Sequence, residues 1–130
     1  MSNANETLIR DIYAAFQRGD IPAFLGMLAP GFTLDVPGTG MLSGKQSLDT
    51  FMGRLGPAME VIRGSFREDP ISIIGSGDEV AALMAHQAER DGKLYRWRTV
   101  QWWRIVDGKA SEFTELVDDY AAFEAVWRHP

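Results

Sequence analysis

The chain lacks cysteine altogether among its 130 residues. This absence excludes disulfide bonds, thiolate nucleophiles and cysteine-ligated metals. No apolar run approaches the roughly 20 residues that a membrane-spanning helix needs. No spacing of His, Asp and Glu suggests a metal site, and there is no serine-nucleophile elbow. We therefore expect no metal, no cofactor and no membrane partner.

The sequence also has no concentration of positive charge. Its 13 Lys and Arg residues are outnumbered by 18 Asp and Glu, and the formal net charge is −5. Because the basic residues form no stripe, nucleic acid is a poor candidate partner. Residues 1–6 are polar and lack the apolar segment of a signal peptide, so we expect a cytoplasmic protein. The length and the 45% apolar content predict one domain over residues 1–130.

Helical patterns dominate the first half of the chain. Apolar residues recur at helical spacing over residues 8–16, and Gly19 supplies a stop. Asp20 then caps a short second helix, which we expect to end at Pro30-Gly31. A short strand over residues 32–36 follows.

A third helix is expected after a glycine-containing loop. Ser43 and Gln46 have capping-box spacing, in which each side chain satisfies a free N–H of the first turn. We expect Gly56-Pro57 to end this helix. Residues 58–63 are compatible with a helical extension or with the start of a strand.

Strand patterns and tight turns dominate the second half. A first strand contains Pro70, which predicts an edge position or a bulge. We expect strands over residues 65–74, 80–90, 93–106 and 110–118, and a closing helix that contains Tyr120, Phe123 and Trp127. The order predicts an α+β fold. It would be a cone-shaped, curved antiparallel sheet covered on its concave face by three N-terminal helices, with a short C-terminal helix.

The turn at Asp91-Gly92 indicates which residues face inward. A two-residue turn sets the pairing of the flanking strands, whose side chains alternate between faces. The opposed pairs are then His86 with Trp97, Met84 with Thr99, and Ala82 with Gln101. These residues share the more apolar face, which we assign to the interior.

The next turn leaves two registers open. A three-residue loop over residues 107–109 places Gln101 opposite Glu115 and turns Phe113 inward. A two-residue loop would place Glu112 and Thr114 inside and expose Phe113. Burial of Phe113 favours the first register.

Four polar residues then interrupt the apolar inner face: His86, Thr99, Gln101 and Glu115. Buried polar groups are costly unless they are paired or used, so the cluster predicts a ligand pocket. His86 suits proton transfer, Glu115 could orient it or share that task, and Gln101 could hold a substrate oxygen. The alternative is a pair, Gln101–Glu115 or His86–Glu115, that only fixes the sheet.

The outer face of the same strands carries an apolar island formed by Leu83, Val100, Trp102 and Leu116. A large aromatic residue in an exposed apolar patch suggests a partner surface. We expect a homodimer through this face. A single tolerated surface tryptophan and a surface for another protein remain the alternatives.

Several segments resemble the nuclear transport factor 2-like superfamily, specifically its SnoaL-like and ketosteroid isomerase-like branch. They read IYAAFQRGD at residues 12–20, FTLDVPG at 32–38, SG at 43–44, DGK at 107–109 and FTELVD at 113–118. The resemblance spans nearly the whole chain and implies a cone-shaped α+β fold and frequent dimers. It also implies a range of functions, from isomerases, cyclases, hydrolases and dehydratases to binding modules.

The positions that work in ketosteroid isomerases are changed here. The base aspartate falls at Val36, the oxyanion tyrosine at Ile12 and the protonated aspartate at Gln101. Asp35 and Tyr13 each lie one residue away. In the similar limonene epoxide hydrolases the last-strand aspartate matches Glu115, but the rest of the set is incomplete. The resemblance to SnoaL-like cyclases implies an acid–base pair, for which His86 and Glu115 could substitute.

These observations predict a protein that binds a small, mostly apolar, carbonyl-bearing or polycyclic ligand. As an enzyme it would use cofactor-free isomerase, cyclase or dehydratase chemistry. The alternative is a non-catalytic ligand-binding or dimerisation module. The catalytic candidates are His86, Glu115 and Gln101. The candidate ligand-binding residues are Tyr13, Asp35, Val36, Met84, Trp97, Thr99, Trp103 and Phe113.

Overall fold

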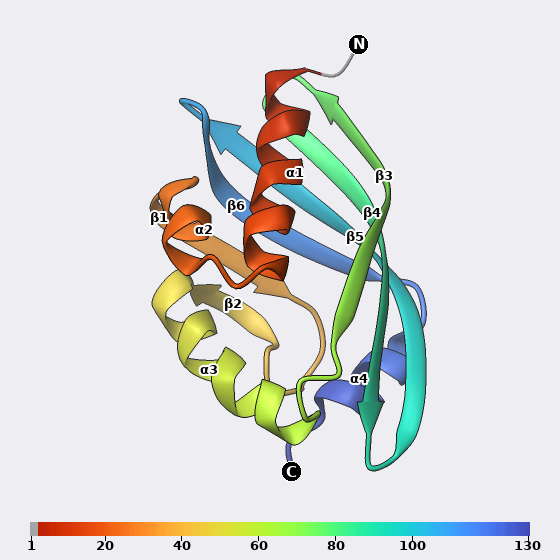
Figure 1. Cartoon of the computed structure of the whole chain (residues 1–130). Coiled ribbons are helices and arrows are strands. Elements are labelled where there is room, and N and C mark those ends of the chain that lie inside the picture. The colour runs from red at the N-terminus through yellow and green to blue at the C-terminus, as the bar shows by residue number, and fades with distance from the viewer. Residues whose placement is uncertain (1–2) are drawn as a thin grey trace.

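The computed structural model describes residues 3–130 and has a curved six-stranded sheet with helices on its concave side (Figure 1). The strand order is β2-β1-β6-β5-β4-β3. The helices are α1 (Ala4–Gln17), α2 (Ile21–Gly26), α3 (Leu48–Val61) and α4 (Tyr120–Trp127). The strands are β1 (Leu28–Val36), β2 (Gly44–Ser47), β3 (Arg67–Ser76), β4 (Glu79–Arg90), β5 (Lys93–Val106) and β6 (Lys109–Val117). The predicted α+β cone is confirmed, with one parallel pair, β1 with β6, in an otherwise antiparallel sheet.

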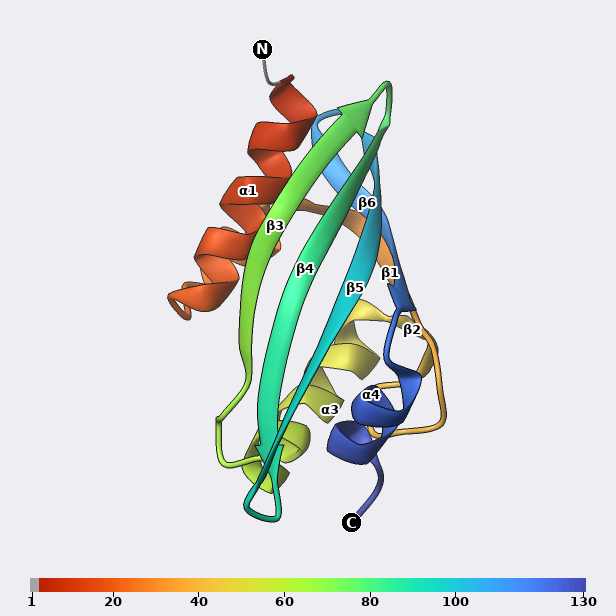
Figure 2. The same ribbon diagram turned by 90° about the vertical axis from the view of Figure 1, so that its right-hand side faces the viewer.

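The helices enclose the concave face from two directions (Figure 2). Helix α1 crosses the upper part of the strands, and α3 lies lower on the same side. Helix α4 closes the lower end beside the turn between β4 and β5. The guanidinium group of Arg90 fixes that closure by donating to the carbonyl oxygen of Val126 at 2.7 Å.

The second helix is shorter than the sequence predicts. Asp20 caps it as expected by accepting from the N–H of Ala23, but the helix ends at Gly26. Leu28 starts β1, so Pro30 and Gly31 lie within a strand rather than ending a helix. A proline fits there because β2 pairs with β1 only from Thr33 onward, which leaves one edge free of ladder hydrogen bonds.

The start of the third helix was also predicted wrongly. Residues 44–47 form β2, and Ser47 caps α3 by accepting from the N–H of Thr50. Ser43 instead donates its hydroxyl to the carbonyl oxygen of Pro37 at 2.7 Å. The helix continues past Pro57, because Ala58 and Ile62 anchor its last turn in the core at 0% and 1% exposure.

The sheet register agrees with the sequence in its central strands. Pairing of β4 with β5 places His86 opposite Trp97 and Gln101 opposite Ala82. Strand β3 lies at the sheet edge, and its register shifts between Pro70 and Ser72, so both expectations for that strand are confirmed.

The turn between β5 and β6 differs from the prediction although the register does not. Gln101 lies opposite Glu115 and Phe113 is 9% exposed, as expected. However, the turn has two residues, Asp107-Gly108, both with positive φ. A bulge leaves Ser111 unpaired between Ala110 and Glu112 and so restores the predicted register.

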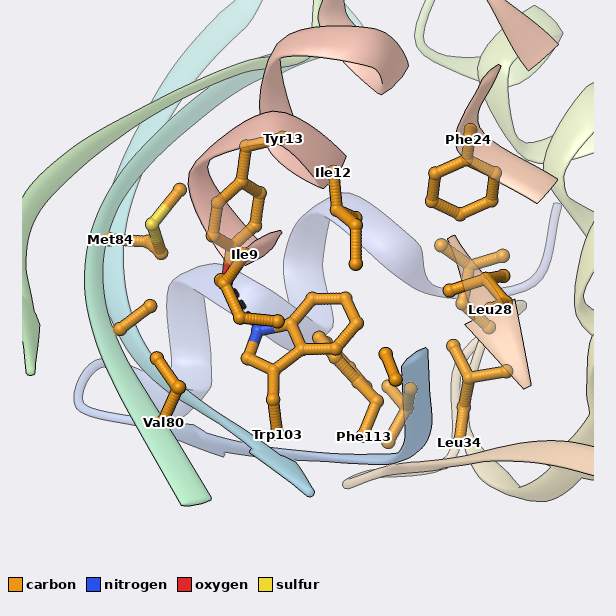
Figure 3. Close-up of a cluster of buried hydrophobic side chains, with 14 of the residues drawn as sticks. Ile9, Ile12, Tyr13, Phe24, Leu28, Leu34, Val80, Met84, Trp103 and Phe113 are labelled. Atoms are coloured by element: carbon orange, nitrogen blue, oxygen red, sulfur yellow. Dashed lines mark hydrogen bonds between the residues drawn. The ribbon is translucent and has the colours of Figure 1, made fainter. Parts of the chain in front are cut away.

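The core fills the space between α1 and the sheet (Figure 3). Ile9, Ile12 and Val80 are at most 1% exposed, and Tyr13 meets Trp103 edge to face with ring centroids 5.7 Å apart. None of the helices in the described part of the chain is long and apolar enough to cross a membrane.

Substitutions at two glycines should change the stability of the fold in opposite directions. A Cβ at Gly40 would lie 2.5 Å from the carbonyl oxygen of Trp127, so Gly40→Ala should destabilise the protein by about 1–3 kcal/mol. Gly53 lies within α3 with open space around it, so Gly53→Ala should stabilise by about 0.5–1 kcal/mol. Urea denaturation measures both values. A Gly40→Ala variant as stable as wild type would contradict tight packing of this loop on α4.

Candidate functional site

The concave side of the sheet contains a cavity of about 110 Å³. Its lining comes from α1, α2, α3 and α4, from the loop before β2 and from every strand except β2. Most lining side chains are apolar, including the aromatic residues Phe16, Phe24, Phe32, Phe51, Phe66, Trp97, Trp103, Phe113, Phe123 and Trp127. The polar lining residues are Tyr13, Glu68, His86, Gln101 and Glu115. A mostly apolar wall with a few placed polar groups is typical of small-molecule sites.

A line of hydrogen bonds connects α1 to β5 and β6. The indole N–H of Trp103 donates to the hydroxyl of Tyr13 at 2.9 Å, and this bond is drawn in Figure 3. The Tyr13 hydroxyl donates to Gln101 Oε1 at 2.6 Å, and Gln101 Nε2 donates to Glu115 Oε2 at 2.7 Å. Each group has a partner, so the orientation of the Glu115 carboxyl is fixed from the protein side.

Glu115 is a weak acid in this setting. Burial raises its pKa from 4.5 to about 7, although the hydrogen bond from Gln101 favours the ionised form. Burial also raises the pKa of Tyr13 well above its ordinary value, so its hydroxyl stays protonated at neutral pH. At neutral pH, Glu115 is therefore the group on this line that gains and loses a proton.

His86 lies between two aromatic rings. Phe66 and Trp97 stack on it with centroid distances of 5.5 and 5.4 Å, and its Nε2 lies 2.6 Å from Thr99 Oγ1. Burial lowers the pKa of His86 to about 4, so the ring is neutral at pH 7. Within residues 3–130, its buried Nδ1 has no hydrogen-bond partner.

Glu68 is a cavity residue that the sequence analysis missed. It lies on β3 directly opposite His86 in the sheet, and its side chain is 9% exposed. Its Oε2 is 3.8 Å from His86 Nδ1, which is too long for a hydrogen bond. Burial, followed by the charges of Glu115 and Asp69, raises the pKa of Glu68 to about 7. Strict alternation along β3 would place Asp69 inward. The bulge after Pro70 shifts the register by one residue and turns Glu68 inward instead.

Most of the predicted site residues line this cavity. They are His86, Gln101, Glu115, Tyr13, Val36, Trp97, Trp103 and Phe113. Asp35 does not line it, because strand alternation turns its side chain away from the face of Leu34 and Val36. Met84 and Thr99 face inward but are covered, at 0% and 2% exposure.

In the part of the chain that the structure describes, no group of three His, Asp or Glu side chains is arranged to hold a metal ion. The cavity instead combines two weakly acidic carboxyl groups with a neutral imidazole. Such groups can bind a ligand oxygen and exchange a proton with it.

Comparison with known proteins identifies the family. The model of the SnoaL-like domain matches residues 9–113. The chain belongs to the SnoaL-like domain family. This confirms the resemblance in the sequence and agrees with the cone-shaped sheet.

Relatives match over nearly their whole length. An uncharacterized protein of Mycobacterium tuberculosis, Rv0034, is 28% identical, and the alignment covers 96% of this chain and 97% of that protein. Bal32a, from a soil-derived mobile gene cassette, superposes with a TM-score of 0.88 at 22% identity, covering 96% of this chain and 97% of Bal32a. TerC, co-crystallized with polyporic acid, superposes with a TM-score of 0.80 at 24% identity. The superposition covers 95% of this chain and 98% of TerC. At these identities the structural likeness shows the fold.

The raised pKa of Glu115 predicts a pH-dependent stability. A carboxyl group whose pKa rises on folding stabilises the protein fully below pH 4.5, and this contribution is lost as the pH rises to about 7. His86 has the opposite effect on stability, because folding lowers its pKa to about 4. Its stabilising contribution is present above pH 6.5 and is lost as the pH falls below that value. The His86 contribution is the same in wild type and in a Glu115 variant, so it cancels in the difference between their free energies of unfolding.

Glu115→Gln should therefore stabilise the protein relative to wild type above pH 7, by on the order of 3 kcal/mol. The amide can still accept from Gln101, and the advantage should shrink to near zero below pH 4.5. Denaturant unfolding from pH 4 to 8 measures the difference. Glu89→Gln, at an exposed position of β4, is the control and should show a flat difference. Parallel pH curves for Glu115→Gln and wild type would contradict a raised pKa.

Proposed function

We propose that this protein binds a small, mostly apolar, carbonyl-bearing ligand in the cavity and exchanges a proton with it through Glu115, without a cofactor. The observation that carries the proposal is the carboxyl group of Glu115, which lines an apolar cavity and is held by Gln101 at 2.7 Å. A base is most effective when its pKa lies near the working pH, and the pKa of Glu115 is about 7.

The proposed step needs no oxidant or reductant. The ionised Glu115 carboxylate removes a proton from the carbon beside the carbonyl group, so a C–H bond breaks and an O–H bond forms. The electron pair forms a C=C bond, and the negative charge moves to the carbonyl oxygen. Glu115 then returns the proton to the same or a conjugated carbon, which is the core of isomerase and cyclase chemistry.

Glu115 is a better proton carrier than His86. The imidazole is neutral at pH 7 because burial lowers its pKa to about 4, so it is a weak base. It is also held by Thr99 and by two stacked rings. We therefore assign proton transfer to Glu115 and the orientation of that carboxyl group to Gln101.

The cavity volume limits the ligand. Because a protein cavity of about 150 Å³ lined by apolar side chains binds benzene, a cavity of about 110 Å³ has room for at most a single ring unless side chains move. Several apolar lining residues are also partly exposed, so the cavity borders solvent beside α1 and α3: Phe16, Leu48, Phe51, Leu55, Met59 and Phe66. A polycyclic ligand would have to displace these side chains.

A non-catalytic binding module is the second candidate. The line from Trp103 to Glu115 satisfies each of its polar groups within the protein, as a structural network would. That role predicts ligand binding without any proton exchange.

Hydrogen–deuterium exchange distinguishes these functions. Acetophenone and 2-cyclohexenone, incubated with the protein in D₂O, should gain deuterium beside the carbonyl group, as measured by proton NMR. Glu115→Gln should slow the exchange at least about a hundredfold while leaving ligand affinity within a few-fold.

Glu112→Gln is the matched control and should exchange like wild type. Binding without exchange in wild-type protein would overturn the enzymatic proposal in favour of the binding module. No binding of any probe would overturn both.

We also propose that two copies associate through the outer sheet face. An outer patch of Ile74, Leu83, Val100, Trp102 and Leu116 extends across β3 to β6, with Trp102 45% and Leu116 57% exposed. Two arginines beside the patch are paired within the chain: Arg98 with Asp118, and Arg104 with Glu79 and Glu112. These ion pairs reduce the charge repulsion between two copies of the patch, which supports a symmetric dimer.

Trp102→Glu should convert the dimer to a monomer by placing a charge in the apolar patch. Sedimentation velocity measures the oligomeric state. Leu25→Lys adds a charge at a similarly exposed position on α2 and should leave the dimer intact. A wild-type monomer at all concentrations would contradict the proposed interface.

A further inference from the structure

The buried Nδ1 atom of His86 has no hydrogen-bond partner within residues 3–130, and the imidazole side chain is only 2% exposed. An unpaired buried polar group costs about 1–3 kcal/mol. The carboxyl oxygen Oε2 of Glu68 lies 3.8 Å from Nδ1, too far for a hydrogen bond. Two groups at this separation can share one ligand atom that lies to the side of the line between them.

The partner of Thr99 determines which imidazole nitrogen carries the proton. The Thr99 side chain is buried, and the one hydrogen-bond partner of its hydroxyl within residues 3–130 is His86 Nε2, at 2.6 Å. If Nε2–H donated to Thr99, the hydroxyl proton would be buried without an acceptor. The hydroxyl therefore donates to Nε2, and in the neutral ring the proton is on Nδ1. Nδ1–H is then a donor without an acceptor, and Glu68 Oε2 lies 3.8 Å from it.

Glu68 supplies the second donor. Burial and the negative charge of Glu115 both raise the pKa of Glu68, to about 7, so its carboxylic acid form is well populated at neutral pH. That form has an O–H group, whereas a carboxylate would only accept. One oxygen atom can accept from two donors 3.8 Å apart if it lies about 2.8 Å from each, beside the line that joins them. Because Nδ1 is covered, the ligand would have to displace a neighbouring side chain to reach this position.

We propose that His86 Nδ1–H and the carboxylic acid of Glu68 together hold the carbonyl oxygen of the ligand. This inference rests on the proposed function and adds two catalytic residues to it. As Glu115 removes the carbon-bound proton, negative charge develops on the oxygen between these two donors and strengthens both hydrogen bonds. Thr99 acts as a positioning residue through the tautomer of His86.

The arrangement selects a class of ligand. Two donors suit an acceptor oxygen, as in a ketone or an enone. A ligand carboxylate would place a full negative charge beside two acidic side chains. The expected substrates are therefore uncharged, single-ring ketones whose enolate oxygen can accept two hydrogen bonds.

Acetophenone and ethylbenzene form a pair of probes that differ mainly in this oxygen. We would titrate both into the full chain, with acetophenone ¹³C-labelled at the carbonyl carbon. In wild-type protein the bound carbonyl resonance should move downfield, and the ¹⁵N signal of His86 Nδ1 should move with acetophenone but not with ethylbenzene. His129, the other histidine, is exposed at the C-terminal end and serves as the internal reference.

Three variants separate a donor from a general change in the cavity. Glu68→Leu removes the donor and should weaken acetophenone binding about tenfold, with ethylbenzene affinity within twofold. Glu68→Gln keeps an N–H donor and should bind acetophenone within threefold of wild type. Glu89→Gln changes a carboxyl group at an exposed position of β4, away from the cavity lining, and should behave like wild type.

The outcomes distinguish this inference from the proposed function. If both probes bind and Glu68→Leu lowers both affinities equally, ligand binding in the cavity is supported but the oxygen-binding role of His86 and Glu68 is overturned. If Glu68→Gln behaves like Glu68→Leu, Glu68 acts as a carboxylate rather than as a donor, and the inference also fails. If neither probe binds wild-type protein, both proposals fail.

Discussion

The hydrogen-bonded line from Trp103 through Tyr13 and Gln101 to Glu115 is the constraint on which the site depends. It joins α1 to the two strands that form the floor of the cone, so the position of the helix and the orientation of the carboxyl group are set together. A carboxyl group on an apolar wall is costly unless it has a partner. Gln101 is that partner, and its own amide oxygen is satisfied by Tyr13. Loss of any member would therefore disturb helix packing as well as the site.

Sequence reasoning succeeded where the register followed from a short turn. The Asp91-Gly92 turn sets the pairing of β4 with β5, so the inward placement of His86 and Gln101 could be predicted. It failed for Glu68, because the bulge after Pro70 shifts β3 by one residue, and proline indicates a bulge without giving its direction. Strand β2 was missed for a related reason: its four residues are too few to show a period, and the capping-box spacing of Ser43 with Gln46 resembled a helix start.

A displacement of one residue has different consequences on a helix and on a strand. Tyr13 is one position from the site where ketosteroid isomerases keep a tyrosine, yet both Ile12 and Tyr13 line the cavity. Successive helical residues differ by about 100° in direction, so neighbours can share a broad face. Asp35 is also one position away, but strand neighbours point to opposite faces, and it is turned from the cavity beside Val36. The chain thus keeps a phenol in the cavity and loses the aspartate.

In the proposed chemistry, Glu68 and Glu115 take the place of that aspartate. Both have a pKa near 7, and the charge of Glu115 raises the pKa of Glu68. Ionisation of one therefore favours protonation of the other, so a single pH supplies a carboxylate and a carboxylic acid in one cavity. Gln101 donates only to Glu115, which makes Glu115 the one that ionises more readily. The same asymmetry leaves Glu68 with the proton that an oxygen-binding donor requires, beside the unpaired nitrogen of His86.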